Sequence, residues 1–416
     1  MADVQPLRAI HYDTAVAGDL GNLVAPPYDV IDDDRRAELA SRSPHNVVAV
    51  DLPVGEDPYA EAARIWLSWR ADGVVVEDAS EALWPLVQEY RGPDGRELRR
   101  RGFLCRVRIE EYGAGRIRPH ERTHPGPKED RLRLTRATRT NLSPIFALYS
   151  DPAGTAWNAL EAASNAPVDA VTDDEGTVHT IWRVDDPATI ATVREALSQA
   201  ELLIADGHHR YETARAYAEE IGGEGPHRFV LVCLVALEDP GLLVFPTHRL
   251  VRGLRPDQHE TLAAALRRDF EIVEVPREDI APPDGSGPLE MGYIDSHFKR
   301  AFRLTLRDQA IADRALPGRS EASRRLDTAI LEELVLKETL GLTDEDISHL
   351  HGLSYARDVP EVLRLIDSGD ADAAFVLRPT PVELVREVAA AGENMPPKST
   401  FFHPKLLTGL LFNPVG

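Results

Sequence analysis

The chain has 416 residues, of which 43% are hydrophobic and 28% are charged, and its formal net charge is -22. This length and balance predict two or three globular domains and exclude a disordered or fibrous protein. The acidic charge argues against a general nucleic-acid binder, which needs a basic face, and no apolar run is long enough to cross a bilayer. We therefore expect a cytoplasmic protein that binds neither nucleic acid nor membrane. The two cysteines, Cys105 and Cys233, lie far apart in apolar runs, which favours buried free thiols over a disulfide or a zinc site.

The first segment, residues 1–115, combines short apolar runs with helical periodicity. Apolar residues at intervals of three and four predict a helix over 60–71. Strand-like runs over 84–90 and 102–109 flank a Gly-Pro-Asp-Gly turn, which indicates a hairpin. The tandem prolines of VAPPYDV (24–30) predict a fixed, extended backbone before the tyrosine. This loop is equally compatible with a rigid turn and with a segment that lines a site.

The middle segment, residues 116–252, contains a basic stretch in an otherwise acidic chain. Residues 116–139 hold eight Lys or Arg against three acids, a local charge of +5. Such a contrast indicates a surface that faces a particular anion. After this stretch we expect a strand over 141–149, a helix and a short antiparallel pair within 156–184, and a helix over 187–199. A buried strand over 229–237 follows, and after it the segment FPTHRLV (245–251).

The most informative stretch is IADGHHRYETA (204–214). An apolar strand end is followed by a glycine, two histidines and an arginine, and then by helical periodicity, so Asp206 to Arg210 should lie at a strand-to-helix junction. Free backbone N–H groups and the positive end of the helix dipole make such a junction an anion site, and Arg210 suits a phosphate. The alternative is that Asp206 only caps the helix while the histidines pack or face solvent. The cost of burying Asp, His and Arg in one turn favours the phosphate site.

The last segment, residues 253–416, is expected to be an α+β domain. Loops rich in Gly and Pro at 253–256 and 281–287 interrupt it. The predicted elements are helices over 258–270, 326–340, 359–368 and 381–391, strands near 291–306 and a strand over 373–377. This irregular order indicates α+β and not a doubly wound sheet. The tail carries the dense motif MPPKSTFFHPKLLTGL (395–410), which we expect to fold back onto the phosphate site.

Three separate motifs carry the residues suited to chemistry: PHE (119–121), DGHHR (206–210) and PKST (397–400). Together they contain a carboxylate, histidines, an arginine, a lysine and hydroxyls, the set that phosphoryl transfer uses. The chain has no P-loop, no GxGxxG after a strand, no GxSxG and no HExxH motif. Zinc is the weaker alternative, because adjacent histidines rarely point to one ion. Its ligands would be His120, His124, His208 and His209.

The DGHHR segment resembles a motif of the archaeal free L-serine kinase family and, more distantly, the GxHR-type signature of the ParB and sulfiredoxin-like superfamily. The order of the motifs is also similar to that of the kinase family: PHE, DGHHR, a strand ending in DAAFVLR (372–378), a helix and PKST. The whole chain, with VAPPYDV, RTHPGPKEDR and MPPKSTFFHPKLLTGL, resembles the bacterial domain-of-unknown-function family ten-fifteen, which belongs with that kinase group.

This resemblance implies a ParB/sulfiredoxin-like nucleotide-binding core over 116–252, with an insertion near 150–180. Mixed α/β segments flank the core, and the C-terminal α+β domain follows it. The resemblance also implies that Glu121 is the catalytic base and that His208 is a second catalytic residue. The implied ligands of the nucleotide phosphates are Asp206, Gly207, His209, Arg210, Lys398, Ser399 and Thr400, with Asp206 also binding the metal.

The function implied is that of a small-molecule kinase. It would use ATP or ADP with Mg²⁺ and phosphorylate the hydroxyl of free L-serine or a similar small alcohol. A serine hydroxyl is a weak nucleophile, so Glu121 would orient it and take its proton. The alternative is a ParB-type regulatory protein that binds or hydrolyses a nucleotide, although the sequence shows neither a clear helix-turn-helix nor a basic DNA face. A third possibility is a binding protein that retains only the anion pocket.

Overall fold

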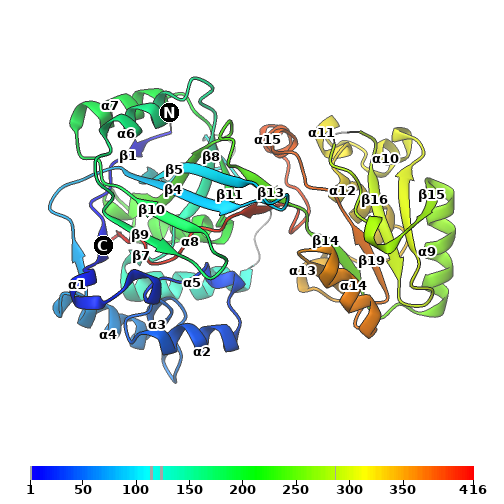
Figure 1. Ribbon diagram of the computed structural model, residues 1–416, viewed down its shortest axis with the longest axis horizontal. Coiled ribbons are helices and arrows are strands. Elements are labelled where there is room, and N and C mark those ends of the chain that lie inside the picture. The colour runs from blue at the N-terminus through cyan, green and yellow to red at the C-terminus, as the bar shows by residue number, and fades with distance from the viewer. Residues whose placement is uncertain (1, 113–115, 122–124, 286) are drawn as a thin grey trace. The chain divides into compact units, whose positions relative to one another are not determined.

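The computed structural model describes residues 2–112, 116–121, 125–285 and 287–416 (Figure 1). The chain forms two compact units. Unit 1 comprises residues 1–119, 123–242 and 404–416, and unit 2 comprises residues 120–122 and 243–403. This grouping differs from the three consecutive segments expected from the sequence, because strands of the first and second segments pair in one sheet and the end of the chain returns to that unit.

Unit 1 is built on a mixed nine-stranded sheet in the order β6-β11-β8-β12-β5-β4-β10-β9, with β1 also paired to β5. Two neighbouring pairs, β6 with β11 and β8 with β12, are parallel, and the others are antiparallel. The strands are β1 (Val4–Gln5), β4 (Trp84–Arg91), β5 (Glu97–Arg108), β6 (Ile117–Arg118), β8 (Ile145–Tyr149), β9 (Asp169–Thr172), β10 (Val178–Ile181), β11 (Leu202–Asp206) and β12 (Phe229–Ala236).

The predicted hairpin and the predicted antiparallel pair are both present in this sheet. Strands β4 and β5 pair from Trp84 with Leu104 to Arg91 with Glu97, and β9 pairs with β10. Within β5, a Cβ atom on Gly102 would come within 3.0 Å of the Val235 side chain and the Leu234 carbonyl oxygen. Only glycine therefore lets β5 and β12 approach each other at this position.

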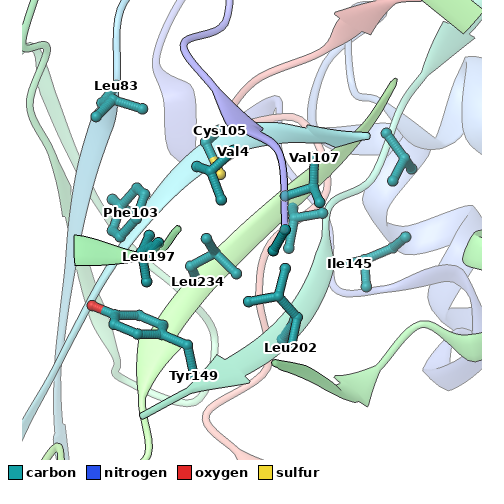
Figure 2. Close-up of a cluster of buried hydrophobic side chains, with 14 of the residues drawn as sticks. Val4, Leu83, Phe103, Cys105, Val107, Ile145, Tyr149, Leu197, Leu202 and Leu234 are labelled. Atoms are coloured by element: carbon teal, nitrogen blue, oxygen red, sulfur yellow. The ribbon is translucent and has the colours of Figure 1, made fainter. Parts of the chain in front are cut away.

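The core of unit 1 joins strands of the sheet to its helices. Figure 2 shows part of this core, including Phe103 of β5 and Leu234 of β12. Phe103 and Leu234 are fully buried in it, and each buried side chain of this kind contributes roughly 1.5 to 3 kcal/mol. Cys105 and Cys233 are buried free thiols, as predicted. The helices of the unit are α1 (Thr14–Ala17), α2 (Asp33–Arg42), α3 (Val48–Asp51), α4 (Pro58–Ala71), α5 (Pro125–Thr138), α6 (Thr155–Ala163), α7 (Pro187–Ala196) and α8 (His208–Ile221), with short 3-10 turns at Leu20–Asn22, Tyr28–Val30 and Pro226–Arg228.

The end of the chain completes unit 1. Strand β21 (Asn413–Pro414) pairs with β7 (Thr140–Asn141), and the fully buried Phe412 packs edge-on against Trp66 at a centroid distance of 5.0 Å. A further two-stranded sheet joins β2 (Ile10–Tyr12) to β3 (Val75–Glu77). The tail is thus part of the packed unit and not an appended segment.

Unit 2 contains a six-stranded antiparallel sheet, of which β14, β15, β16 and β19 are labelled in Figure 1. The strand order is β15-β17-β16-β19-β14-β18. A separate pair joins β13 to β20. The strands are β13 (Leu243–Phe245), β14 (His248–Val251), β15 (Phe270–Val275), β16 (Glu290–Asp295), β17 (Ala301–Leu306), β18 (Leu353–Ala356), β19 (Ala373–Val376) and β20 (Phe401–His403). The helices are α9 (Pro256–Asp269), α10 (Gln309–Ala315), α11 (Glu321–Arg324), α12 (Asp327–Leu331), α13 (Asp344–His349), α14 (Val359–Ser368) and α15 (Val382–Ala390), with a 3-10 turn at Arg277–Asp279.

The predicted α+β class is confirmed, with two differences in unit 2. The expected helix over 326–340 is α12 followed by a π-helical stretch, Glu332–Lys337. The segment FPTHRLV (245–251) is divided between β13 and β14, which belong to different sheets. None of the helices in the described ranges has both the length and the apolar character needed to span a bilayer.

Candidate functional site

The DGHHR motif lies at a strand-to-helix junction in unit 1, as predicted. Strand β11 ends at Asp206, Gly207 has a φ of +94°, and α8 begins at His208. A Cβ atom at Gly207 would also lie only 3.0 to 3.2 Å from the Arg210 guanidinium. Glycine is required here both for the left-handed backbone and for the close approach of Arg210.

Asp206 links two cations at this junction. One carboxylate oxygen lies 2.6 Å from the Lys405 ammonium, and the other lies 2.5 Å from the Arg210 guanidinium. Burial raises the pKa of Asp206, but Lys405 and Arg210 outweigh burial and hold that pKa well below its usual range. The carboxylate is therefore ionised, and two positive side chains surround one negative one.

Arg210 is held firmly by the fold. Its guanidinium donates to the Ser143 hydroxyl at 2.9 Å and to the Pro144 carbonyl oxygen. The Thr408 hydroxyl in turn donates to Ser143 at 3.0 Å. Because Ser143, Pro144 and Asp206 all hold its guanidinium, Arg210 supports the structure as well as presenting charge at the helix start.

Tyr28 of the VAPPYDV loop lines a small cavity that Arg210 also lines. Tyr28 begins a 3-10 turn, and its ring lies over the Arg131 guanidinium at 4.4 Å. The cavity has a volume of about 40 Å³, and Tyr28, Asp51, Arg131 and Arg210 are among its lining residues. Burial raises the pKa of Tyr28 to about 12, so its hydroxyl remains protonated at neutral pH. The loop is thus a turn that also lines a cavity.

In unit 2, His120 and Glu121 of the PHE motif lie beside residues 395–400, which contain the PKST motif. Glu121 forms a parallel β-bridge with Met395, and the Met395 N–H donates to the His120 carbonyl oxygen at 2.7 Å. The His120 ring, which is fully buried, lies 2.9 Å from the Thr400 hydroxyl. Residues of two motifs that most of the chain separates in sequence therefore lie together within one unit.

The PKST loop has a strained and well-supported backbone. Lys398 has a φ of +56°, in the left-handed region that residues other than glycine rarely adopt. Its side chain is exposed. The buried Ser399 hydroxyl donates to the Pro396 carbonyl at 2.7 Å and lies 2.9 Å from the Thr328 hydroxyl. The Thr380 hydroxyl donates to the Ser399 carbonyl at 3.0 Å. Ser399 therefore stabilises the loop, and Lys398 is the residue that the loop displays.

Arg249 of β14 is a site residue that the sequence did not indicate. Its side chain is buried, and its guanidinium donates to the backbone carbonyls of Pro397 and Lys398, each at 3.0 Å. Burial lowers the pKa of Arg249, and Tyr355, Glu332 and Glu121 oppose that shift. Nothing in the run FPTHRLV separates this arginine from an ordinary strand residue, so only the fold reveals it.

Lys405 of unit 1, which contacts the DGHHR motif, is a second site residue that the sequence did not indicate. The tail motif contains two lysines, Lys398 and Lys405, and the PKST pattern drew attention to the first. The structure places Lys405 against Asp206, while Lys398 lies with Glu121 and Thr400 in unit 2. Within unit 1, the part of the tail that contacts the DGHHR motif therefore includes Lys405.

The remaining predicted residues fall into the same two groups. His208 is buried and His209 is half-buried at the start of α8, with Asp206, Gly207 and Arg210. Glu121, Lys398, Ser399 and Thr400 belong to unit 2. His124, named as a possible zinc ligand, lies outside the described residues.

The residues around Asp206 do not fit a magnesium ion. Both carboxylate oxygens already contact cationic side chains, and magnesium requires oxygen ligands that are free of such competition. Among the residues that the structure describes, no group of three or more His, Cys, Asp or Glu side chains is placed to hold a metal.

Comparisons with known proteins give one family and several distant structures. The family model described as "Protein of unknown function (DUF1015)" matches residues 4–329. No protein with a curated description matches. Similar solved structures include a conserved hypothetical protein from Pyrococcus furiosus (16% identity, 69% of this chain and 87% of that chain, TM-score 0.34) and a free serine kinase in complex with AMP (15%, 69% and 83%, 0.35). A third is SbnI with a C-terminal truncation from Staphylococcus aureus (13%, 73% and 85%, 0.36).

Proposed function

This chain belongs to the DUF1015 family of proteins of unknown function, and we propose that it is a small-molecule kinase with a ParB/sulfiredoxin-like core. It transfers a phosphate from ATP or ADP to the hydroxyl of free L-serine or a similar small alcohol. The observation that carries the proposal is the DGHHR junction, where Arg210 and Lys405 flank a single carboxylate at the start of α8. Such a surplus of donors and positive charge suits the phosphates of a nucleotide.

The donor phosphates bind at the start of α8. The first-turn backbone N–H groups of this 14-residue helix have no intrahelical acceptors, and the helix dipole adds a partial positive charge. Arg210 is already oriented by Ser143 and Pro144, so it binds a phosphate oxygen without first being ordered. His208 and His209 supply further donors at the same turn.

The acceptor is activated by Glu121. Its carboxylate takes the proton of the substrate hydroxyl while that oxygen forms a bond to the terminal phosphorus. The bond between phosphorus and the bridging oxygen of the nucleotide breaks, and its electron pair remains on the nucleotide product. Lys398, which is exposed on the PKST loop of the same unit as Glu121, stabilises negative charge during transfer. Thr400 adds a hydroxyl to this group, while Ser399 acts through the loop backbone.

Turnover with product identification tests the proposal. The full chain is incubated with ATP or ADP and with L-serine, D-serine, L-threonine or glycerol, and the products are identified by ³¹P NMR and mass spectrometry. Phosphoserine, or the phosphate ester of another of these alcohols, supports the kinase. Release of inorganic phosphate without any ester, equal in the presence and absence of acceptor, supports instead the nucleotide-hydrolysing regulatory alternative.

A further inference from the structure

A second cation at the proposed phosphate site comes from the end of the chain. Lys405 reaches Asp206 across nearly two hundred residues of sequence, and its ammonium lies 2.6 Å from the carboxylate. Its side chain is only 19% exposed. Holding a lysine in one place costs rotamer entropy, so its position needs support from the surrounding fold.

That support is a buried pair of side chains in the sheet of unit 1. Arg100 of β5 is 1% exposed and donates to the Pro404 carbonyl at 2.5 Å. Gln88 of β4 donates through Nε2 to the Lys405 carbonyl at 3.0 Å. Arg100 also donates through Nε to the Gln88 side-chain oxygen at 2.9 Å. We call Arg100 and Gln88 the tail clamp, because they fix two successive carbonyls of the tail.

The tail clamp is anchored on its other side. Gln88 Nε2 lies 3.2 Å from His179 Nδ1, and His179 Nε2 lies 2.9 Å from the Asp173 carboxylate. The Arg100 guanidinium lies over the Phe146 ring at 4.6 Å, and burial lowers the pKa of Arg100 to about 10. Burying a guanidinium and an amide is expensive unless their hydrogen bonds are made, and here they are made to the backbone beside Lys405.

We propose that Lys405 is a ligand of the donor phosphates and that Arg100 and Gln88 are its positioning residues. This inference rests on the proposed function, because it adds a ligand and its support to the same phosphate site. Asp206 holds the ammonium and the Arg210 guanidinium on opposite oxygens, which places two phosphate-binding cations next to each other. A lysine supplies a compact point charge and an arginine a planar fork, and phosphate sites use both.

The test measures binding of ADP and of inorganic pyrophosphate to the full chain by calorimetry. Lys405→Met removes the charge and keeps the length, so both affinities should fall by about 10- to 100-fold, the range of a charge-assisted hydrogen bond. Lys299→Met, at an exposed lysine of unit 2, is the matched control and should bind like the parent. Equal affinities for Lys405→Met and the parent would overturn the inference.

Two double variants separate a direct ligand from a structural partner of Asp206. Asp206→Asn removes the charge that Lys405 neutralises, so Lys405→Met in that background leaves no unpaired carboxylate. A direct ligand still loses affinity there, whereas a lysine that only neutralises Asp206 shows no loss, and this second result overturns the inference. Gln88→Met should weaken binding severalfold in the parent and have no further effect in Lys405→Met. If the effects of Gln88→Met and Lys405→Met on affinity are additive, Gln88 does not act by positioning Lys405.

These outcomes also distinguish the inference from the function on which it rests. If binding of ADP or pyrophosphate depends on Lys405 but no phosphate ester is formed, Lys405 is a phosphate ligand and the proposed kinase activity is wrong. If a phosphate ester is formed and Lys405→Met binds both compounds as the parent does, the kinase activity is supported and Lys405 is not a phosphate ligand. A parent protein that binds neither compound overturns both.

Discussion

Glu121 is the residue on which the chemistry of the proposal depends. The variant Glu121→Gln keeps the size and removes the base, so turnover should fall by about 100-fold or more, the usual contribution of a positioned base. Nucleotide affinity should stay within about twofold of the parent, because the donor phosphates are assigned to other residues. Steady-state rates and calorimetry on the same preparation check both statements.

The matched control for this variant is Glu332→Gln. Glu332 also acts on Arg249 electrostatically but has no part in the PHE or PKST motifs. Its variant should retain turnover to within about threefold. Losses of the same size in the two variants would show that the charge near Arg249 matters and that Glu121 is not the base.

The ion pairs of Asp206 give stability with a defined dependence on pH. Because the folded pKa of Asp206 lies below its unfolded value, the stabilisation is complete above that unfolded value and is lost as pH falls toward the folded pKa. Asp206→Asn should therefore cost about 3 kcal/mol at neutral pH, the scale for breaking a largely buried pair. The difference from the parent should shrink below about pH 4. Urea unfolding at several pH values measures it, and a difference that is constant with pH would contradict the depressed pKa.

At the scale of elements, the PKST loop keeps a backbone that its sequence disfavours. A lysine in the left-handed region costs about 1 to 2 kcal/mol relative to the right-handed one, and glycine avoids this cost at some loss of entropy. Lys398→Gly should therefore stabilise the protein by up to about 1 kcal/mol while lowering turnover. Thermal unfolding of the ligand-free chain measures the gain in stability, and steady-state rates measure the loss of turnover.

Lys398→Ala is the comparison for that variant. It removes the same amine but keeps the unfavourable backbone, so it should lose turnover without gaining stability. If glycine and alanine unfold at the same temperature, the left-handed backbone stores no measurable energy. If both variants keep full activity, Lys398 has no role in transfer.

Strand β14 carries a second pH-dependent element, His248. Its side chain is 2% exposed, its Nδ1 accepts from the Leu377 N–H at 3.2 Å, and burial lowers its pKa from 6.5 to about 4. Above about pH 6.5 the imidazole is neutral in both the folded and the unfolded protein. As pH falls below that value, the unfolded protein takes up a proton on this histidine before the folded protein does. The protein should thus lose about 3 kcal/mol as pH falls from about 6.5 to 4, and His248→Gln should abolish this loss. Denaturant titrations of both proteins over this range decide the matter.

The elements themselves were largely predictable, because they depend on local patterns. Alternation and a Gly-rich turn indicated the β4–β5 hairpin, and the start of helical periodicity after DGHHR located α8 to within a few residues. The helix expected over 326–340 contains a π-helical stretch, which periodicity alone does not distinguish. The division of 245–251 into two strands depends on pairing with β18, β19 and β20, which lie more than a hundred residues away.

The site was predictable only where residue type and local pattern coincide. DGHHR and PKST stand out because Gly, His, Lys and hydroxyls gather in one turn. Arg100, Arg249 and Lys405 do not stand out, because each is a lone basic residue whose role comes from backbone carbonyls or a carboxylate far away in sequence. Such contacts are set by tertiary packing and leave no local periodicity.

At the scale of the whole molecule, the last residues of the chain are structural parts of unit 1. Leu406, Leu407, Leu411 and Phe412 are buried, and Thr408 bonds to Ser143. Removing residues 404–416 would leave apolar surface exposed and Asp206 without Lys405, so unit 1 should lose its cooperative unfolding transition. Calorimetry of the shortened chain checks this, and Phe412→Ala is the milder comparison, with an expected cost of about 3 to 5 kcal/mol. A shortened chain that unfolds like the parent would show that the tail contributes no stability.

The return of the tail to unit 1 also bears on how the protein is made. Residues 1–242 leave the ribosome long before residues 404–416, yet β7 lacks its partner and Phe412 is missing from its place beside Trp66 until the tail arrives. Residues 243–403, by contrast, make up nearly all of unit 2 in one continuous stretch, so this unit can complete its own sheet earlier. N-terminal domains usually fold first during synthesis. In this chain we expect unit 2 to complete its fold first, and the nascent N-terminal unit to expose apolar surface that chaperones bind until the tail is made.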